Sequence, residues 1–185
     1  MRSDITIAPF AGKWPQIHDS AFIAPGCRII GDVTIGAESS IWYNCVIRGD
    51  VNRIVIGART NIQDGSVVHC DSPKPSRPEG FPTVIGDDVL IGHMAMIHGC
   101  VLEDRAFVGM GAMVMDGCRI ESDAMLAAGA MLTPGKVIPA RQMWLGRPAV
   151  YTRELTDEAL ADMQAGVRGY ALNAKMHRAA LGRDS

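Results

Sequence analysis

The chain has few aromatic residues: Phe, Trp and Tyr together make up 5% of its 185 residues. An excess of charge of one sign is also lacking, since 18 lysine and arginine residues face 20 aspartate and glutamate residues. A net charge of −2 gives no reason to expect nucleic acid or an anionic membrane as a partner. No apolar run approaches the roughly 18 residues that span a bilayer, and the N-terminal residues lack the apolar core of a signal peptide. We therefore expect a soluble, cytoplasmic protein.

Cysteine pairs of the C-x-x-C kind are absent, and the five cysteines are an odd number. Without a signal peptide, this pattern favours reduced thiols, most of them small buried side chains. Apolar residues nevertheless make up 48% of the chain, and there are 20 glycines. A core of Ile, Val, Leu, Met and Ala with so few rings indicates a narrow interior. The length fits one domain with a tail.

A branched aliphatic residue recurs at every sixth position through eighteen hexads. The four runs are Ile23 to Ile47, Ile56 to Val68, Ile85 to Ile97, and Leu102 to Ile138. A period of six fits neither an α-helix nor a plain alternating strand. Hexapeptide repeats are a signature of the parallel β-helix, in which three hexads make one triangular coil. The sequence therefore predicts an all-β solenoid of about six coils over residues 21–143, after a lead-in at 1–20.

Breaks in the repeat predict where the coils are interrupted. The step from Ile47 to Ile56 is nine residues, which predicts a bulge of three around RGDVNR. The step from Val68 to Ile85 is seventeen, which predicts an inserted loop at 71–83 that contains four prolines. After a connector at 144–155, the segment 156–181 has the pattern of an α-helix that packs along the prism. Thr156 is its expected N-cap. The apolar residues expected to share one helix face are Leu160, Met163, Val167, Tyr170 and Ala174.

Polar residues fall into columns when the hexads are stacked. Arg48, His69 and His98 each follow an inward aliphatic residue one coil apart, so they should lie in one column at the interstrand spacing of about 4.8 Å. Adjacent imidazoles at that spacing can bind one metal ion. His93 occupies another hexad position and another side of the prism, with Asp64 one coil below it.

The column count suggests a site that two subunits share. If prisms associate around a threefold axis, the His93 side of one subunit can meet the His69 and His98 column of its neighbour. Three neutral imidazoles with an open fourth position are the usual arrangement of a catalytic zinc, which lowers the pKa of bound water toward about 7. The alternative is that these histidines are ordinary surface or structural residues, which is our interpretation of His18 and His177.

Four motifs set in these repeats closely resemble the gamma-class carbonic anhydrase family: IRGD (47–50), NIQDGSVVH (61–69), IGHMAMIHGC (91–100) and WLGRPA (144–149). The resemblance covers nearly the whole chain. It implies a left-handed β-helix that forms a homotrimer with a metal at each interface. Two ligands would come from one subunit, matching His69 and His98, and the third from the next, matching His93. The metal would be Zn2+, with Fe2+ or Co2+ as alternatives.

The resemblance also implies roles for other residues. Gln63 would hydrogen-bond the hydroxide on the metal and help to place CO2, with Asn61 nearby. Tyr170 matches a tyrosine on the C-terminal helix near the site, although simple helix packing is an equal alternative.

The resemblance further implies that Arg48 pairs with Asp64 or Asp50, partly across the interface. This charged pair would border the metal and organise the trimer. An ordinary surface ion pair is the alternative, and it would contribute little to stability.

The sequence departs from the family pattern at two places. A Glu that follows the R-x-D aspartate in the best-studied enzymes is Val51 here. Their acidic loop, which supplies a glutamate that shuttles protons, is replaced by DSPKPSRPEGFP, whose only acids are Asp71 and Glu79. These two residues are the candidates for the shuttle. Each turnover requires a proton to leave, so we expect the departures to affect rate more than metal binding.

We expect a metalloenzyme, a carbonate dehydratase of the lyase class, that hydrates CO2 reversibly to bicarbonate at a homotrimer interface. An acyl-CoA thioesterase that uses the same metal is an alternative enzyme. A hexapeptide acyltransferase typically relies on one catalytic histidine, which fits this chain less well. The alternative that is not an enzyme is a trimeric scaffold in which the metal only holds the subunits together.

Overall fold

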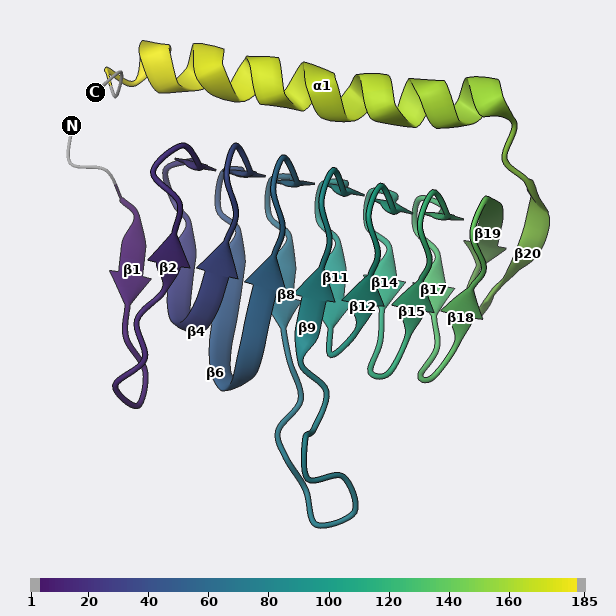
Figure 1. The fold of residues 1–185 in the computed structure, drawn as a ribbon, viewed down its shortest axis with the longest axis horizontal. Coiled ribbons are helices and arrows are strands. Elements are labelled where there is room, and N and C mark those ends of the chain that lie inside the picture. The colour runs from purple at the N-terminus through teal and green to yellow at the C-terminus, as the bar shows by residue number, and fades with distance from the viewer. Residues whose placement is uncertain (1–3, 183–185) are drawn as a thin grey trace.

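The protein is described by a computed structural model over residues 4–182. It is a parallel β-solenoid with one α-helix, α1 (Asp157–Ala180), lying along its length (Figure 1). Strands repeat on three faces, and the strands from β3 to β18 make six coils. The predicted fold class is therefore confirmed.

We name the three faces by what they present. The helix face, which α1 covers, contains β3 (Phe22–Ile23), β5 (Ser40–Ile41), β7 (Asn61–Ile62), β10 (Leu90–Ile91), β13 (Phe107–Val108), β16 (Met125–Leu126) and β19 (Gln142–Gly146). The histidine face contains β1 (Thr6–Ala8), the first parts of β4 (Arg28–Ile35) and β6 (Val46–Ile56), β8 (Val67–His69), β11 (Met96–His98), β14 (Met113–Val114) and β17 (Met131–Leu132). The third face contains β2 (Gln16–Ile17), the ends of β4 and β6, β9 (Thr83–Ile85), β12 (Val101–Leu102), β15 (Arg119–Ile120) and β18 (Val137–Ile138). The segment after β19 returns as β20 (Ala149–Glu154), which pairs with it antiparallel.

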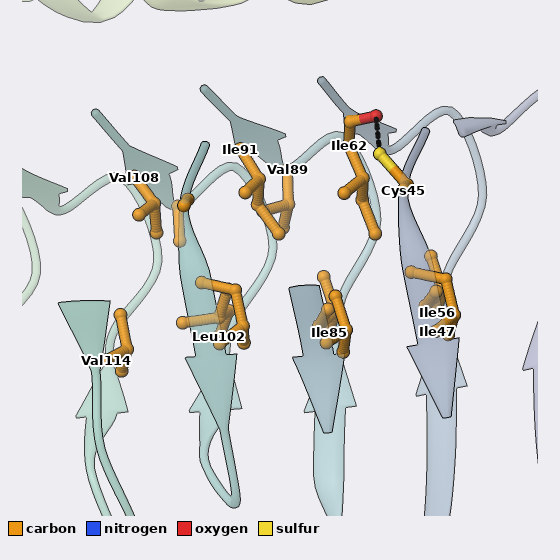
Figure 2. Packing of buried hydrophobic residues seen from close by; sticks show 14 of the residues in the cluster. Cys45, Ile47, Ile56, Ile62, Ile85, Val89, Ile91, Leu102, Val108 and Val114 are labelled. Atoms are coloured by element: carbon orange, nitrogen blue, oxygen red, sulfur yellow. Dashed lines mark hydrogen bonds between the residues drawn. The ribbon is translucent and has the colours of Figure 1, made fainter. Parts of the chain in front are cut away.

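The inward aliphatic residues stack coil upon coil and form the core. Ile47 pairs in register with Val68, and Val68 with Ile97, and all three side chains are fully buried. Figure 2 shows how such residues from successive coils line one narrow interior. The repeat folds this way because each face needs one branched side chain per coil to fill a space too small for rings.

The predicted interruptions lie where the phase of the hexads breaks. Gly31 pairs with Gly49 and Val33 with Ile54, so β6 contains three more residues than β4 at the bend between two faces. The 71–83 segment leaves the solenoid between β8 and β9 and projects from its edge (Figure 1). Antiparallel bridges between Asp71 and Phe81 and between Lys74 and Arg77 give this loop the form of an irregular hairpin.

A second inward position, two residues before each aliphatic residue, was not foreseen in the sequence. Four of the five cysteines occupy it: Cys27, Cys45, Cys100 and Cys118. Hydroxyl side chains occupy it elsewhere and bridge neighbouring coils. The Thr60 hydroxyl, for example, donates to the carbonyl of Gly86 at 2.7 Å and accepts from the amide of Val89 at 3.0 Å. Alanine is common at the remaining positions, and Val33, Ile54 and Val89 are larger side chains that are also buried there.

One edge of the prism, between the third face and the helix face, bears charges of alternating sign. We call this set the charge ladder: Glu38, Arg59, Asp88, Arg105, Asp123 and Arg141, one residue per coil. Arg59 forms two 2.7 Å hydrogen bonds with Asp88, and Arg105 forms two of 2.8 Å with Asp123. Every ladder residue has a left-handed φ between 55° and 63°, which the tight corner requires.

Helix α1 packs on the helix face through the side predicted from the sequence. Thr156 is the N-cap, and its hydroxyl accepts from the amide of Ala159 at 3.2 Å. Leu160, Met163, Val167 and Ala174 are buried. The charge ladder continues into the helix, because Arg141 donates to Asp157 in its first turn at 2.5 Å. Over residues 4–182, no helix is long and apolar enough to cross a membrane.

The burial of the cysteines predicts thiols that react only when the solenoid opens. All five are free, and each is at most 1% exposed. Burial also raises the pKa of Cys100 well above its usual range and that of Cys70 to about 11. Because the thiolate is the reactive form, we expect almost no labelling by Ellman's reagent in native protein at pH 8. All five thiols should react at once in guanidinium. Rapid labelling of native protein would contradict the described core.

Candidate metal centre

His69 and His98 meet on the histidine face as the column count predicted. They are direct register partners on β8 and β11. Nδ1 of His69 lies 3.0 Å from Nε2 of His98, and the ring centroids are 5.0 Å apart. Both side chains point outward, because each follows an inward aliphatic residue on its strand. Two ring nitrogens from adjacent coils thus face one point at the surface.

The position of His69 is fixed by the bulge in β6. Asp50 lies in the extra residues of that strand, and its Oδ1 accepts from Nε2 of His69 at 2.9 Å. Its Oδ2 forms an ion pair with Arg48. Burial alone would raise the pKa of the Asp50 carboxyl, but the hydrogen bonds from His69 and Arg48 outweigh it and lower that pKa. Asp50 therefore stays ionised and holds the ring of His69.

Thr83 locks the backbones that carry the two histidines. It is the first residue of β9, where the inserted loop rejoins the solenoid, and it is fully buried. Its hydroxyl donates to the carbonyl of His69 and accepts from the amide of Gly99 at 2.9 Å. The loop can therefore leave the coil directly after His69 without disturbing the register of His69 and His98.

His93 lies at the edge between the helix face and the histidine face. As predicted, Asp64 occupies the same column one coil away, and its Oδ2 lies 2.8 Å from Nδ1 of His93. The hydroxyl of Tyr170 on α1 lies 3.3 Å from Nε2 of the same ring. Burial, and then the charge of Asp64, raise the pKa of the Tyr170 hydroxyl, so this group stays protonated beside His93.

Asn61 and Gln63 lie beneath α1 on β7 and directly after it. Nε2 of Gln63 donates to Oδ1 of Asn61 at 3.1 Å. Asn61 is 1% exposed and Gln63 is 4% exposed. Nδ2 of Asn61 is buried without a hydrogen-bond partner among the described residues. Such an orphaned donor costs free energy, and it indicates that a polar atom absent from the isolated chain belongs beside it.

One residue of this region escaped the sequence analysis. Asp116 follows β14 at the edge beyond His98, and its Oδ1 lies 2.5 Å from Nδ1 of His98. Counting hexads could have identified it, because Asp116 lies one coil beyond His98. The amide of Gly117, the residue after Asp116, bonds to the carbonyl of Gly99, the residue after His98. Each of the three histidines thus has its own aspartate: Asp50, Asp64 and Asp116.

The two acids of the inserted loop are differently engaged. Asp71 accepts from Lys74 at 2.8 Å, and this hydrogen bond lowers the pKa of the half-buried Asp71 carboxyl. Glu79 is exposed, and its backbone carbonyl accepts from the Asn52 side chain at 2.7 Å. The loop is therefore tied to the bulge of β6 through Asn52, which also donates to the carbonyl of Asp71 at 3.0 Å.

The paired imidazoles fit a metal ion. Two ligands of a tetrahedral zinc, each with a Zn–N distance of about 2.0–2.1 Å, lie about 3.3 Å apart, which is close to the 3.0 Å between His69 and His98. Within one chain, no group of three His, Cys, Asp or Glu side chains among residues 4–182 is arranged to hold a metal. The structure thus joins His69 with His98 and leaves His93 on a different edge.

Comparison with known proteins agrees with the repeat. The family model "Bacterial transferase hexapeptide (six repeats)" matches residues 15–49. The model "Hexapeptide repeat of succinyl-transferase" matches residues 82–116 and 101–134. Among solved structures, the product of the BC4754 gene of Bacillus cereus superposes with a TM-score of 0.91 at 40% identity, covering 96% of this chain and 99% of that one.

The curated relatives are more specific than the repeat models. "Gamma carbonic anhydrase 1, mitochondrial" of Arabidopsis thaliana is 47% identical over 90% of this chain, which spans only 60% of that relative. "Carbonic anhydrase" of Geobacillus kaustophilus is 43% identical, with 94% of this chain and 91% of that protein covered. This similarity extends over almost the full length of both chains. The chain belongs to the gamma carbonic anhydrase family.

Proposed function

We propose that this protein hydrates CO2 reversibly to bicarbonate at a metal site between the subunits of a homotrimer. The observation that supports this most is the pair of ring nitrogens of His69 and His98, 3.0 Å apart and facing outward. One chain supplies two ligands there, while His93 lies on another edge, so a second copy of the chain is the natural source of the third. A bound Zn2+, Fe2+ or Co2+ would supply hydroxide near neutral pH by acidifying a water molecule.

The protein's own residues would orient the reactants. Gln63 and Asn61 place amide groups beside the edge that bears His93, and the orphaned Nδ2 of Asn61 offers a donor to an oxygen of CO2 or bicarbonate. Arg48 and Asp50 lie at the other half of the site and hold His69. The released proton would pass to Glu79 or Asp71 on the loop, or to buffer. Without a richer acidic loop, we expect turnover that depends on buffer concentration.

A thioesterase is the second candidate, and one feature favours it. A cleft of about 500 Å³ lies between the inserted loop and the bulge of β6, lined by Val51, Asn52, Pro73, Glu79 and Pro82 among others. A neighbouring hollow reaches Asp50, which holds His69. An acyl-CoA placed in this cleft would bring its thioester near the same metal. Hydrolysis of acyl-CoA substrates by the purified protein would support this candidate.

A cytoplasmic location also remains part of the proposal. The relatives from Arabidopsis are named as mitochondrial proteins, so the compartment is best tested directly, by microscopy of the tagged protein.

Replacement of a histidine from the facing pair should abolish activity together with metal binding. In stopped-flow assays on protein purified without oxygen, we expect CO2 hydration with metal near one ion per subunit. His98→Ala should lose both, because a site with two protein ligands binds weakly. His18→Ala is the matched control, since the exposed His18 ring hydrogen-bonds only to Ser20 among residues 4–182. Full metal content without hydration would refute the proposed reaction and leave the thioesterase candidate.

Mixing two inactive variants tests whether two subunits share the site. His93→Ala retains the His69 and His98 pair, and His98→Ala retains His93. A mixed ring of three subunits contains one complete site, so unfolding and refolding an equal mixture should restore about a quarter of wild-type turnover. Each variant refolded alone should stay inactive. Absence of recovery in demonstrably mixed trimers would contradict a site built from His93 of one subunit and the pair of another.

The hydroxyl and the ring of Tyr170 should have separable roles. The ring packs edge-on against Trp42 with centroids 5.3 Å apart, while the hydroxyl contacts His93. Tyr170→Phe should therefore leave the urea midpoint nearly unchanged but lower turnover. Tyr170→Ala should also lose about 2–3 kcal/mol of stability, somewhat less than a fully buried ring would. Equal turnover for wild type and Tyr170→Phe would leave helix packing as the only role of this residue.

A further inference from the structure

The Asp116 carboxylate is in close contact with the His98 ring. Its Oδ1 lies 2.5 Å from Nδ1 of His98, and both side chains are about one-third exposed, at 33% and 32%. Among residues 4–182, the carboxylate forms no ion pair with a lysine or an arginine. Its charge is therefore directed at one imidazole rather than at a surface cation.

The local backbone is shaped to admit this carboxylate. Gly99, with φ of 55°, lies beside it, and a Cβ there would come within 2.3 Å of Oδ1 of Asp116. Gly117, with φ of 71°, follows Asp116, and a Cβ there would come within 2.7 Å of the Phe81 ring. Arg77 stacks on the same ring, 3.9 Å from its centroid. Gly99 thus makes room for the Asp116 carboxylate, and Gly117 makes room for the Phe81 ring at the end of the inserted loop.

The contact decides which nitrogen of His98 can bind a metal. An ionised carboxylate only accepts hydrogen bonds, so Nδ1 of His98 carries the proton and Nε2 keeps its lone pair. Nε2 is the atom that faces Nδ1 of His69, whose own Nε2 is held by Asp50. Without Asp116, the His98 ring could carry its proton on either nitrogen and could rotate about its side-chain bonds.

We propose that Asp116 is a positioning residue that fixes His98 with Nε2 directed at the metal. This inference rests on the proposed function, because it assigns a role within that metal site. It completes a set in which every histidine ligand has its own carboxylate, an arrangement that orients the ring and makes the ligand nitrogen more basic.

The test compares Asp116→Ala and Asp116→Asn with wild-type protein. The dissociation constants for Zn2+ and Co2+ are measured by chelator competition on the metal-free full-length protein. Asp116→Ala should bind both ions 10-fold to 100-fold more weakly, the effect typical of losing such a partner. Asp116→Asn should lose less, since its amide oxygen can still accept from Nδ1. Asp123→Asn is the matched control, because it removes a carboxylate that pairs with Arg105 in the charge ladder.

A second readout needs no metal and no activity. Nitrogen-15 NMR of the imidazoles in metal-free protein should show the His98 proton on Nδ1 in wild type. In Asp116→Ala, the proton should be shared between the two nitrogens. Circular dichroism and the urea midpoint establish that each variant is folded, so a tautomer change in folded protein reports on orientation rather than on general stability.

The outcomes separate this inference from the proposed function. If wild type binds Zn2+ and His98→Ala does not, the metal site stands. Unchanged dissociation constants for Asp116→Ala would then overturn the role of Asp116 alone, as would equal weakening in Asp123→Asn. If wild type and His98→Ala bind Zn2+ equally, the proposed metal site and the role of Asp116 both fall.

Discussion

Hydrogen bonding between successive coils sets the spacing of the side chains along every face of this molecule. The amide of Val67 donates to the carbonyl of Ala95 at 2.9 Å, and the amide of Gly99 to that of His69 at 3.2 Å. Because neighbouring strands are locked at about 4.8 Å, residues three hexads apart become lateral neighbours. The pairing of His69 with His98 follows from this constraint. The separation of His93 follows too, since a residue five places earlier on an extended chain cannot return to the same face.

Much of the fold and of the placement of the site residues was predictable, because in a solenoid the number of residues between two positions decides whether they lie on neighbouring coils. The hexad count predicted about six coils, the place of Asp64 one coil from His93 in the same column, and a three-residue bulge after Ile47. The structure adds the contact of Asp64 with His93 and shows that the bulge brings Asp50 to His69. Helix α1 was predictable for a local reason, the cap at Thr156 ahead of an apolar stripe. In each case the relevant neighbours lie on adjacent coils, so counting along the chain is enough to identify them.

Other features depend on side-chain direction, which spacing does not encode. The role of Asp116 requires that its rotamer turn toward His98 across a corner emptied by Gly99. The inward place of Cys27 and Cys45 becomes evident only when the coil is seen to bury two positions per hexad. The return of β20 against β19 lies beyond the last hexad, where the period that guided prediction has stopped. The hexad spacing therefore identifies which residues are neighbours, whereas the orientation of their side chains is seen only in the structure.

The charge ladder has a consequence for how such a protein can change its length. Its sign alternates from coil to coil, from Glu38 through Arg59 to Asp88 and onward, so the pattern repeats every two coils rather than every one. Deleting or duplicating a single coil would bring two like charges face to face at the junction, which is destabilising. Deleting or duplicating a pair of coils would keep opposite charges opposed. Growth or shortening of this solenoid is therefore easier in even steps.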